Sequence, residues 1–120
     1  MRRLSHVDAR GAARMVDVSA KPVTSRAAVA RGFLRVSAAA MRLARRGELR
    51  KGGVVEVARL AGVLAAKRTF EAIPLCHPLP LQHVDVDVVA RRGGFAIEAR
   101  VKTDARTGAE MEALHAVAVA

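Results

Sequence analysis

The chain has 120 residues, 52% of them apolar, and carries 21 Lys and Arg against 11 Asp and Glu, a formal net charge of +10. This length suits one domain, residues 1–120, with a single core. No apolar run approaches the roughly 18 residues that a membrane span needs, and no apolar segment follows the N-terminal arginines, so we expect neither an anchor nor a signal peptide. A single cysteine excludes an internal disulfide and a multi-cysteine zinc site, and we expect a cytoplasmic protein without metal or other cofactor.

The strong positive charge favours anionic partners. Nucleic-acid binding is not expected, because single-strand and RNA-binding surfaces stack bases on aromatic side chains, and this chain has three Phe, no Trp and no Tyr. A compact anion such as a nucleotide triphosphate fits at least as well. Among the bases, four are lysines, which unlike arginine can be tuned to exchange a proton, so each marks either a functional position or a chance occurrence: Lys21, Lys51, Lys67 and Lys102.

The N-terminal third of the chain predicts an arm followed by two strands. Residues 1–14 are polar and mixed in character, which is typical of a loose arm. Met15–Ser19 alternates apolar and polar residues and predicts a short strand. The apolar residues within 26–36, which have Gly32 among them, predict a second strand that is either regular or bulged.

Two helices are predicted next. Ser37 is a plausible N-cap for a short helix over 38–45, and Gly47 suits its C-terminal end. A longer helix is predicted from 54 to about 72, because apolar residues recur at spacings of three and four on one face. That face comprises Val57, Leu60, Leu64 and Lys67. Lys67 either runs along this stripe to solvent or places its ammonium group in a pocket at the helix end.

A hairpin and a final helix complete the pattern. Residues 83–88 and 95–101 alternate strictly and flank a Gly93-Gly94 turn, so they predict an antiparallel hairpin with one buried face. Thr107 and Glu110 have the spacing of a capping box, which predicts a helix that begins at Thr107. Glu110 serves either as this cap or in a binding pocket.

Two segments carry residues suited to chemistry. The first is the loop between Pro74 and Pro78, which holds the one cysteine, Cys76, beside His77. Each proline restricts its own φ and the residue before it, so the loop is stiff enough to orient a polar side chain; the simpler interpretation is that one proline ends a helix and the other begins a strand. The second segment is the last helix, where the Glu112 carboxylate can accept paired hydrogen bonds from the N–H edge of a guanine or pterin.

Five blocks of sequence occur in a specific order and spacing. They are Met15-Val16-Asp17-Val18-Ser19-Ala20-Lys21, Lys51-Gly52, Ala65-Ala66-Lys67-Arg68-Thr69, Ile73-Pro74-Leu75-Cys76-His77-Pro78-Leu79 and Thr107-Gly108-Ala109-Glu110-Met111-Glu112-Ala113-Leu114. Together they resemble the molybdenum cofactor biosynthesis protein C family, whose members are cyclic pyranopterin monophosphate synthases. The resemblance runs from about Leu4 to Ala120.

The resemblance implies both a fold and a reaction. The fold is α+β, an antiparallel sheet with helices packed on one face as a two-layer sandwich. The reaction rearranges 3′,8-cyclised 7,8-dihydro-GTP to cyclic pyranopterin monophosphate and releases pyrophosphate. Family members form homo-oligomers, hexamers built from dimers, with the site at the dimer interface. The alternative function is a catalytically inactive fragment of the same fold that binds a nucleotide or a partner.

The resemblance also assigns roles by position. Lys51 matches a catalytic lysine. Substrate-contacting positions are matched by Leu75, Cys76, His77, Met111 and Glu112. Further pocket positions are matched by Lys21, Arg26, Lys67 and Glu110. Lysine and histidine suit the proton transfers of ring opening and ring closure, and cations suit a leaving pyrophosphate.

The chain departs from the family pattern at its last residue. Family members continue the last helix through an Ile-Tyr-Asp-Met-Cys-Lys segment that carries an aspartate and a second catalytic lysine, and a terminal strand follows. This sequence ends at Ala120, just before that segment. We therefore expect a domain that is incomplete at the C-terminus and inactive on its own.

Overall fold

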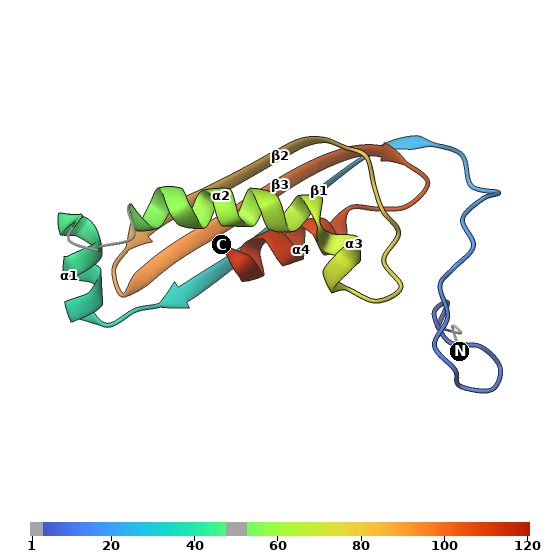
Figure 1. Cartoon of the computed structure of the whole chain (residues 1–120), viewed down its shortest axis with the longest axis horizontal. Coiled ribbons are helices and arrows are strands. Elements are labelled where there is room, and N and C mark those ends of the chain that lie inside the picture. Colours follow the sequence, from blue (N-terminus) through green and yellow to red (C-terminus); the bar gives the residue numbers. More distant parts are fainter. Residues whose placement is uncertain (1–3, 48–52) are drawn as a thin grey trace.

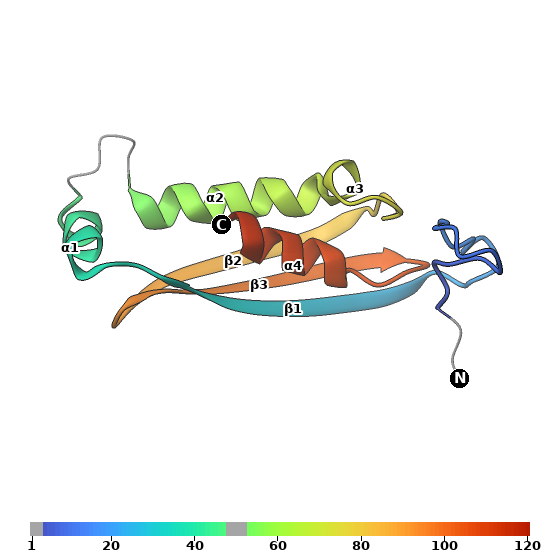
Figure 2. The ribbon, with the colours of Figure 1, turned by 90° about the horizontal axis from the view of Figure 1, so that it is seen from below.

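The structure is a computed structural model that describes residues 4–47 and 53–120. Three long strands form one antiparallel sheet in the order β1-β3-β2. They are β1 (Thr24–Arg35), β2 (Leu81–Arg91) and β3 (Gly94–Ala105). In the two described ranges four helices accompany the strands: α1 (Ala38–Arg46), α2 (Val54–Lys67), α3 (Thr69–Ala72) and α4 (Glu110–Val119). Figures 1 and 2 show α2 and α4 lying across one face of the sheet and α1 at one end, which confirms the expected two-layer α+β arrangement.

The hairpin β2–β3 forms as its alternation predicts. Arg91 pairs with Gly94, so the turn consists of Arg92 and Gly93 rather than the predicted Gly93-Gly94, and Gly94 begins β3. Gly93 adopts a φ of 83° that favours glycine. The inward side chains of both strands are buried under the helices. The core residues of the hairpin are Val86, Val88, Phe95, Ile97, Ala99 and Val101. One face of the sheet therefore holds the core, and in the described chain no helix covers the other face (Figure 2).

The predicted strand over Met15–Ser19 does not form. Asp17 accepts hydrogen bonds from both the backbone N–H and the hydroxyl group of Ser19, at 2.9 and 2.6 Å, and the N–H of Lys21 donates to the carbonyl of Val18. These local bonds make a turn, and they compete with pairing to another strand. The segment is thus a folded connection into β1 rather than part of the sheet.

The predictions for β1 and α1 are confirmed. β1 keeps an unbroken register against β3 from Thr24 to Arg35, so it is regular, and the one register shift of the sheet lies in β2 between Leu81 and His83. The Ser37 hydroxyl caps α1 by accepting from the Ala40 N–H at 3.2 Å. Gly47 ends α1 in the left-handed conformation.

The helix predicted over 54–72 is interrupted at Arg68, between α2 and α3. The Thr69 hydroxyl lies 3.0 Å from the carbonyl oxygen of Ala65 and 3.1 Å from that of Ala66. The backbone N–H of Arg68 bonds to Ala65 in the tighter three-residue pattern. Thr69 therefore replaces a backbone bond with a side-chain bond, and the chain changes direction before the two-proline loop.

The predicted apolar stripe of α2 faces solvent rather than the core. Val57, Leu60 and Leu64 are each more than half exposed. The buried face of α2 instead consists of the small residues Gly62, Ala65 and Ala66. A Cβ atom on Gly62 would lie 3.0 Å from the Ala116 carbonyl oxygen, so the close approach of α2 to α4 requires small residues on the inside.

α4 begins later than the capping box predicts. The N-cap residue is Ala109, no side chain caps the helix, and Thr107 lies outside it. Ala109 is buried against Ala30, Val101 and Ala113, so packing on the sheet determines where the helix starts. The inward face of α4 consists of Glu112, Ala113 and Ala116, whereas Met111 and Leu114 are exposed.

None of the helices in the two described ranges is both long enough and apolar enough to cross a lipid bilayer. Residues 4–14, predicted to be a loose arm, form a small turn in which the Asp8 carboxylate accepts from the N–H groups of Arg10 and Ala12. In Figure 1 this turn lies away from the sheet.

The contact between Gly32 of β1 and Val117 of α4 gives a test of this packing. A Cβ atom on Gly32 would lie 2.7 Å from Cγ1 of Val117. We expect Gly32→Ala to lower the free energy of unfolding by about 1–3 kcal/mol, because overpacking displaces α4. Urea denaturation of Gly32→Ala, Val117→Ala and the double variant measures the effect. The double variant should lose less than the sum of the single losses, and simple additivity would contradict this contact.

Candidate active site

The loop after α3 presents its side chains through an unusual backbone conformation. Leu75 has a φ of 62°, the one positive φ outside glycine in the described residues. Such a conformation costs on the order of 1 kcal/mol and persists where the surroundings enforce it, which occurs often at functional sites. The flanking prolines and the bond from the Cys76 N–H to the Ile73 carbonyl, 3.3 Å long, hold the loop in place. The following side chain, Cys76, is half-buried.

Cys76 lies against Glu112 of α4. The thiol Sγ is 3.6 Å from Glu112 Oε1, and the thiol donates to the carboxylate. The two residues are 36 positions apart in sequence, and the turn between α3 and β2 brings them together. The structure therefore unites two of the residues that the family resemblance assigns to substrate contact.

Both groups of this pair have raised pKa values. Burial, followed by the neighbouring Glu112 carboxylate, raises the pKa of the Cys76 thiol to about 11. Burial also raises the pKa of Glu112, and the exposed Glu110 adds a smaller repulsion. A thiol with such a pKa is protonated at neutral pH, so Cys76 acts as a hydrogen-bond donor and not as a nucleophile.

One oxygen of Glu112 has an unfilled capacity for hydrogen bonding. Glu112 is 3% exposed, and its Oε2 is the one buried side-chain nitrogen or oxygen in the described residues without a hydrogen-bond partner. An unsatisfied buried carboxylate oxygen costs about 1–3 kcal/mol or more. Its position in the first turn of α4 offsets part of that cost, because the helix dipole favours negative charge there. The arrangement is suited to a ligand that brings N–H donors.

His77 faces a hollow on the other side of the loop. The hollow has a volume of about 450 Å³, and His77 and Arg106 line it together with Val18 and Val23 of the N-terminal connection. The two hydrogen bonds from Ser19 hold the pKa of the Asp17 carboxyl below its usual range, and the nearby His77 lowers it slightly further. The N-terminal connection thus forms one wall of a space that is also lined by Arg106 and by Asp104.

The other predicted pocket residues are distributed around this loop. Arg26 lies on the helix-covered face of β1, half-buried, and its Nε donates to the Ala105 carbonyl at 3.4 Å. The carbonyl of Lys21 accepts from Arg106 at 3.1 Å. Lys67, exposed at the end of α2, lines a separate hollow of about 330 Å³ beside β2. Lys51 lies outside the described residues.

The remaining predicted residues lie close to Cys76 or Glu112 in the sequence. Glu110 is exposed, and its carboxylate folds over Gly108 rather than capping α4, so its expected role in a capping box is wrong. Leu75 and Met111 each expose 36% of their surface, which leaves two flexible or apolar side chains next to the pair.

Sequence reasoning missed three residues of this region. Arg106 shares the hollow of His77. Thr69 and His115 contact one another behind the loop, at 3.1 Å between Thr69 Oγ1 and His115 Nδ1. The spacing of His115, three residues after Glu112 on α4, was a usable signal, because residues three apart share a helix face. Within the described ranges, no three metal-ligating side chains gather closely enough to hold an ion.

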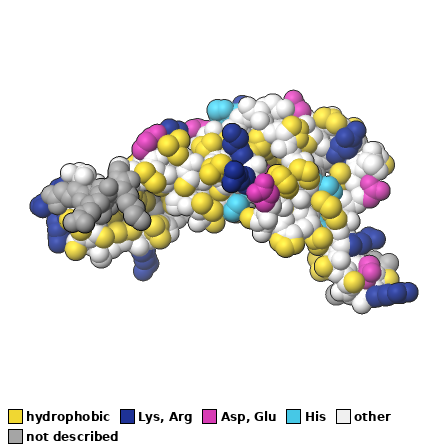
Figure 3. Space-filling model, in the orientation of Figure 1, with side chains coloured by type: hydrophobic (Ala, Val, Ile, Leu, Met, Phe, Trp, Pro, Cys, Tyr) yellow, Lys and Arg dark blue, Asp and Glu magenta, His cyan; other side chains and the backbone are white. Residues whose placement is uncertain are grey.

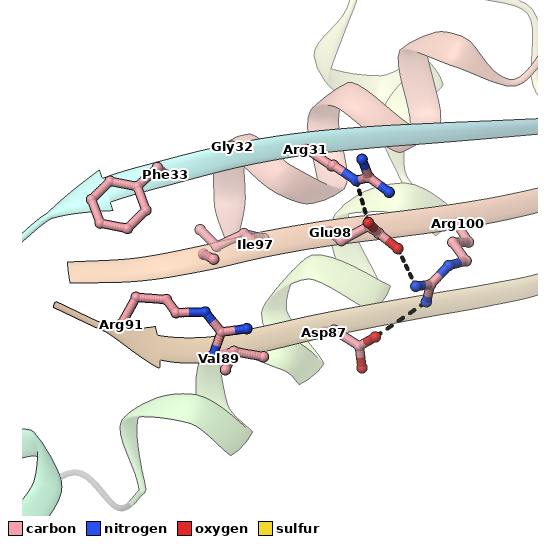
Figure 4. A pocket seen from close by; sticks show the side chains of 10 residues that line it. Arg31, Gly32, Phe33, Asp87, Val89, Arg91, Ile97, Glu98 and Arg100 are labelled. Carbon is pink, nitrogen blue, oxygen red and sulfur yellow. Dashed lines mark hydrogen bonds and ion pairs between the residues drawn. The ribbon is translucent and has the colours of Figure 1, made fainter.

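A third hollow, on the helix-free face of the sheet, does not resemble a binding site. Figure 4 shows Arg31 and Arg100 joined through Glu98, and Arg100 bonds further to Asp87 at 3.1 Å. Because these charges satisfy one another across the strands, little electrostatic attraction remains for an anion. The hollow measures about 370 Å³ and lies on the opposite face of the sheet from Cys76 and Glu112.

The buried charge of Glu112 gives a testable effect on stability. Its folded pKa exceeds its unfolded value, so the folded state binds the extra proton between those two pKa values and loses stability as the pH rises through that interval. Because a glutamine side chain does not ionise, the Glu112→Gln variant does not lose stability in this way as the pH rises. We expect its Tm to exceed that of the wild type at neutral pH, by about 3–6 °C per kcal/mol gained, and to match it at acidic pH.

Thermal unfolding followed by circular dichroism at several pH values measures this difference, with the exposed Glu71→Gln as the matched control. The control should follow the wild type at every pH. A Glu112→Gln variant that is less stable than the wild type at neutral pH would show that the folded protein favours the ionised carboxylate.

The MoaC family profile matches residues 15–120. A cyclic pyranopterin monophosphate synthase from Thermomicrobium roseum is 57% identical over 122 residues, covering 100% of this chain and 74% of that protein. Proteins of the same name from Parvibaculum lavamentivorans and Cereibacter sphaeroides are 52% and 53% identical. The alignment with the Parvibaculum protein covers 98% of this chain and 75% of that protein. The alignment with the Cereibacter protein covers 100% of this chain and 77% of that protein. The expected resemblance is confirmed: this chain belongs to the MoaC family.

Proposed function

We propose that this chain is a cyclic pyranopterin monophosphate synthase, a lyase of molybdenum cofactor biosynthesis. Together with the aspartate and the second lysine that the resemblance places after position 120, it converts 3′,8-cyclised 7,8-dihydro-GTP to cyclic pyranopterin monophosphate and releases pyrophosphate. The observation that carries the proposal is the buried Glu112 carboxylate, which has one oxygen on Cys76 and the other without a partner. The names of the relatives, at 52–57% identity, support the same reaction.

Glu112 suits the purine end of the substrate. A guanine presents two neighbouring N–H donors, and a carboxylate accepts both in a paired geometry. The same edge persists in the pterin product, so one residue can hold substrate and product throughout the reaction. Leu75 and Met111 then contact the ring, and the protonated thiol of Cys76 orients the carboxylate.

The basic residues suit the phosphate end and the proton transfers. We assign Lys21, Arg26 and Lys67 to the phosphates, where cations stabilise the charge that develops as pyrophosphate leaves. His77 and Lys51 are assigned to proton transfer, because imidazole and amine groups exchange protons near neutral pH when their surroundings tune them. The net charge of +10 draws the anionic substrate towards the protein.

The alternative, a catalytically inactive fragment that binds a nucleotide or a partner, is not favoured. The relatives carry the name of an enzyme over the whole of this chain. A cytoplasmic location fits a chain with a single cysteine whose proposed substrate derives from GTP.

We also propose that the protein works as a homo-oligomer, a hexamer built from dimers. The exposed stripe of α2, formed by Val57, Leu60 and Leu64, supports self-association because apolar patches on a surface mark protein contacts. Figure 3 shows apolar side chains spread over the helix-covered face, with basic side chains among them. A second subunit on this face would cover apolar surface and bring further cations near the site.

Nucleotide selectivity tests the assignment of Glu112. We expect the wild type to bind GTP or its cyclised derivative more tightly than ATP, because the adenine edge presents an acceptor where guanine presents a donor. Glu112→Ala should reduce that preference by about 1–3 kcal/mol and reduce total affinity less. Titration calorimetry measures both, with Glu71→Ala as the control. Equal affinity of the wild type for GTP and ATP would contradict the assignment.

Conversion of the cyclised dihydro-GTP in a single-turnover assay tests the reaction itself. The resemblance places an aspartate and a second lysine after position 120, so the assay compares the 120-residue polypeptide with a version that continues through that segment. We expect product from the longer version and none from the shorter. In the longer version, Lys51→Arg should slow turnover by about 10²-fold or more while binding survives.

Three results of this assay would change the proposal. Equal product from both versions would show that the site needs nothing beyond Ala120. Unchanged turnover in Lys51→Arg would make Lys51 a phosphate anchor rather than a proton donor or acceptor. A longer version that binds the substrate without forming product would favour the inactive alternative.

A further inference from the structure

His115 is joined to the end of α2 by two short contacts of one ring nitrogen. Its Nδ1 lies 3.0 Å from the carbonyl oxygen of Ala65 and 3.1 Å from Oγ1 of Thr69. Thr69 is fully buried, and its hydroxyl oxygen also lies within 3.1 Å of the carbonyls of Ala65 and Ala66. Three elements, α2, α3 and α4, therefore meet at this point.

These distances determine which ring nitrogen carries the hydrogen. A carbonyl oxygen can only accept, so Nδ1 of His115 must donate to Ala65. The Thr69 hydroxyl donates to one of the two backbone carbonyls, which leaves its oxygen free to accept from the same Nδ1–H. The other nitrogen, Nε2, is the acceptor in the neutral ring. Because a protonated ring also carries a hydrogen on Nδ1, this contact survives in either charge state.

The contact belongs to a closed circuit of hydrogen bonds that includes the proposed active site. The Thr69 carbonyl accepts from the Ile73 N–H at 2.9 Å, and the Ile73 carbonyl accepts from the Cys76 N–H at 3.3 Å. The Cys76 thiol then donates to Glu112 at 3.6 Å. Glu112 lies one helical turn before His115 on α4, so the circuit leaves this helix at one residue and returns at the other.

We propose that His115, through Thr69, is a positioning residue that holds Cys76 against Glu112. The functional meaning rests on the proposed synthase activity, although the geometry stands without it. His115 fixes the start of the two-proline segment relative to α4. The thiol can then occupy Oε1 of Glu112 and leave Oε2 available for the ligand. Without this contact the segment can move away from α4, and the carboxylate loses its fixed orientation.

The single cysteine of the chain makes the circuit measurable without any ligand. Alkylation by iodoacetamide requires the thiolate, so the pH midpoint of the rate reports the pKa of Cys76 alone. In the wild type we expect a midpoint near 11. His115→Leu removes the Nδ1–H donor and replaces the imidazole with an apolar side chain of similar size. Its midpoint should fall towards the ordinary thiol value, with alkylation at neutral pH about tenfold faster for each unit of the fall.

His115→Asn provides the rescue, because its amide nitrogen stands close to the position of Nδ1–H and can donate to Ala65. It should keep the wild-type profile. Val88→Ala, in the core beneath α2, controls for general loss of stability, and it should unfold more easily without moving the midpoint. Thr69→Val, which lacks the hydroxyl, and Thr69→Ser, which keeps it, make the same comparison at the residue that His115 contacts. This second pair decides the question where His115→Leu does not fold.

The proposal is overturned by a folded His115→Leu or Thr69→Val variant whose midpoint equals that of the wild type, or by a His115→Asn variant that behaves like His115→Leu. Calorimetry with cyclised dihydro-GTP separates this inference from the proposed function. Failure of the wild type to bind this nucleotide, together with the expected midpoints, would refute the function and support the positioning role. Nucleotide binding that survives with unshifted midpoints in all variants would refute the positioning role alone.

Discussion

The burial of one carboxylate, that of Glu112, is the constraint on which the rest of this structure depends. A charged group removed from water must find hydrogen bonds, and in the described residues the thiol of Cys76 bonds one oxygen of the carboxylate while the other oxygen has no partner. The strained loop conformation at Leu75 brings that thiol into place. We propose that the protein gives up stability at neutral pH to keep this carboxylate oxygen for a ligand, which is a common exchange between stability and activity.

The scaffold around this carboxylate is built for close approach. α4 rests on β1 where Gly32 leaves room for Val117, and it meets α2 where Gly62 leaves room for the backbone at Ala116. Small residues at both contacts allow the helix to lie deep against the sheet, and the larger apolar side chains of α2 consequently point outward. The same packing that buries Glu112 therefore exposes the α2 stripe, so the proposed site and the proposed subunit contact have one structural origin.

Much of the fold could be predicted from sequence, because strict alternation and a glycine turn identify the β2–β3 hairpin and caps identify α1. Periodicity identified the apolar stripe of α2, but this stripe faces solvent rather than the core, so the predicted orientation of the helix was wrong. The capping box at Thr107 failed because Ala109 packs on the sheet and sets the helix start. At the site, the motifs singled out Cys76 and Glu112. The contact between Thr69 and His115, 46 residues apart, arises only from tertiary packing.

The pKa of the Glu112 carboxyl, measured by carbon-detected NMR in the free protein and with bound cyclised dihydro-GTP, tests the central claim most directly. In the free protein the pKa of Glu112 should lie above the ordinary value of a glutamate, because burial disfavours the charge. On binding it should fall, because ligand N–H donors favour the ionised form. A normal pKa in the free protein, or one that the bound nucleotide leaves unchanged, would contradict the account.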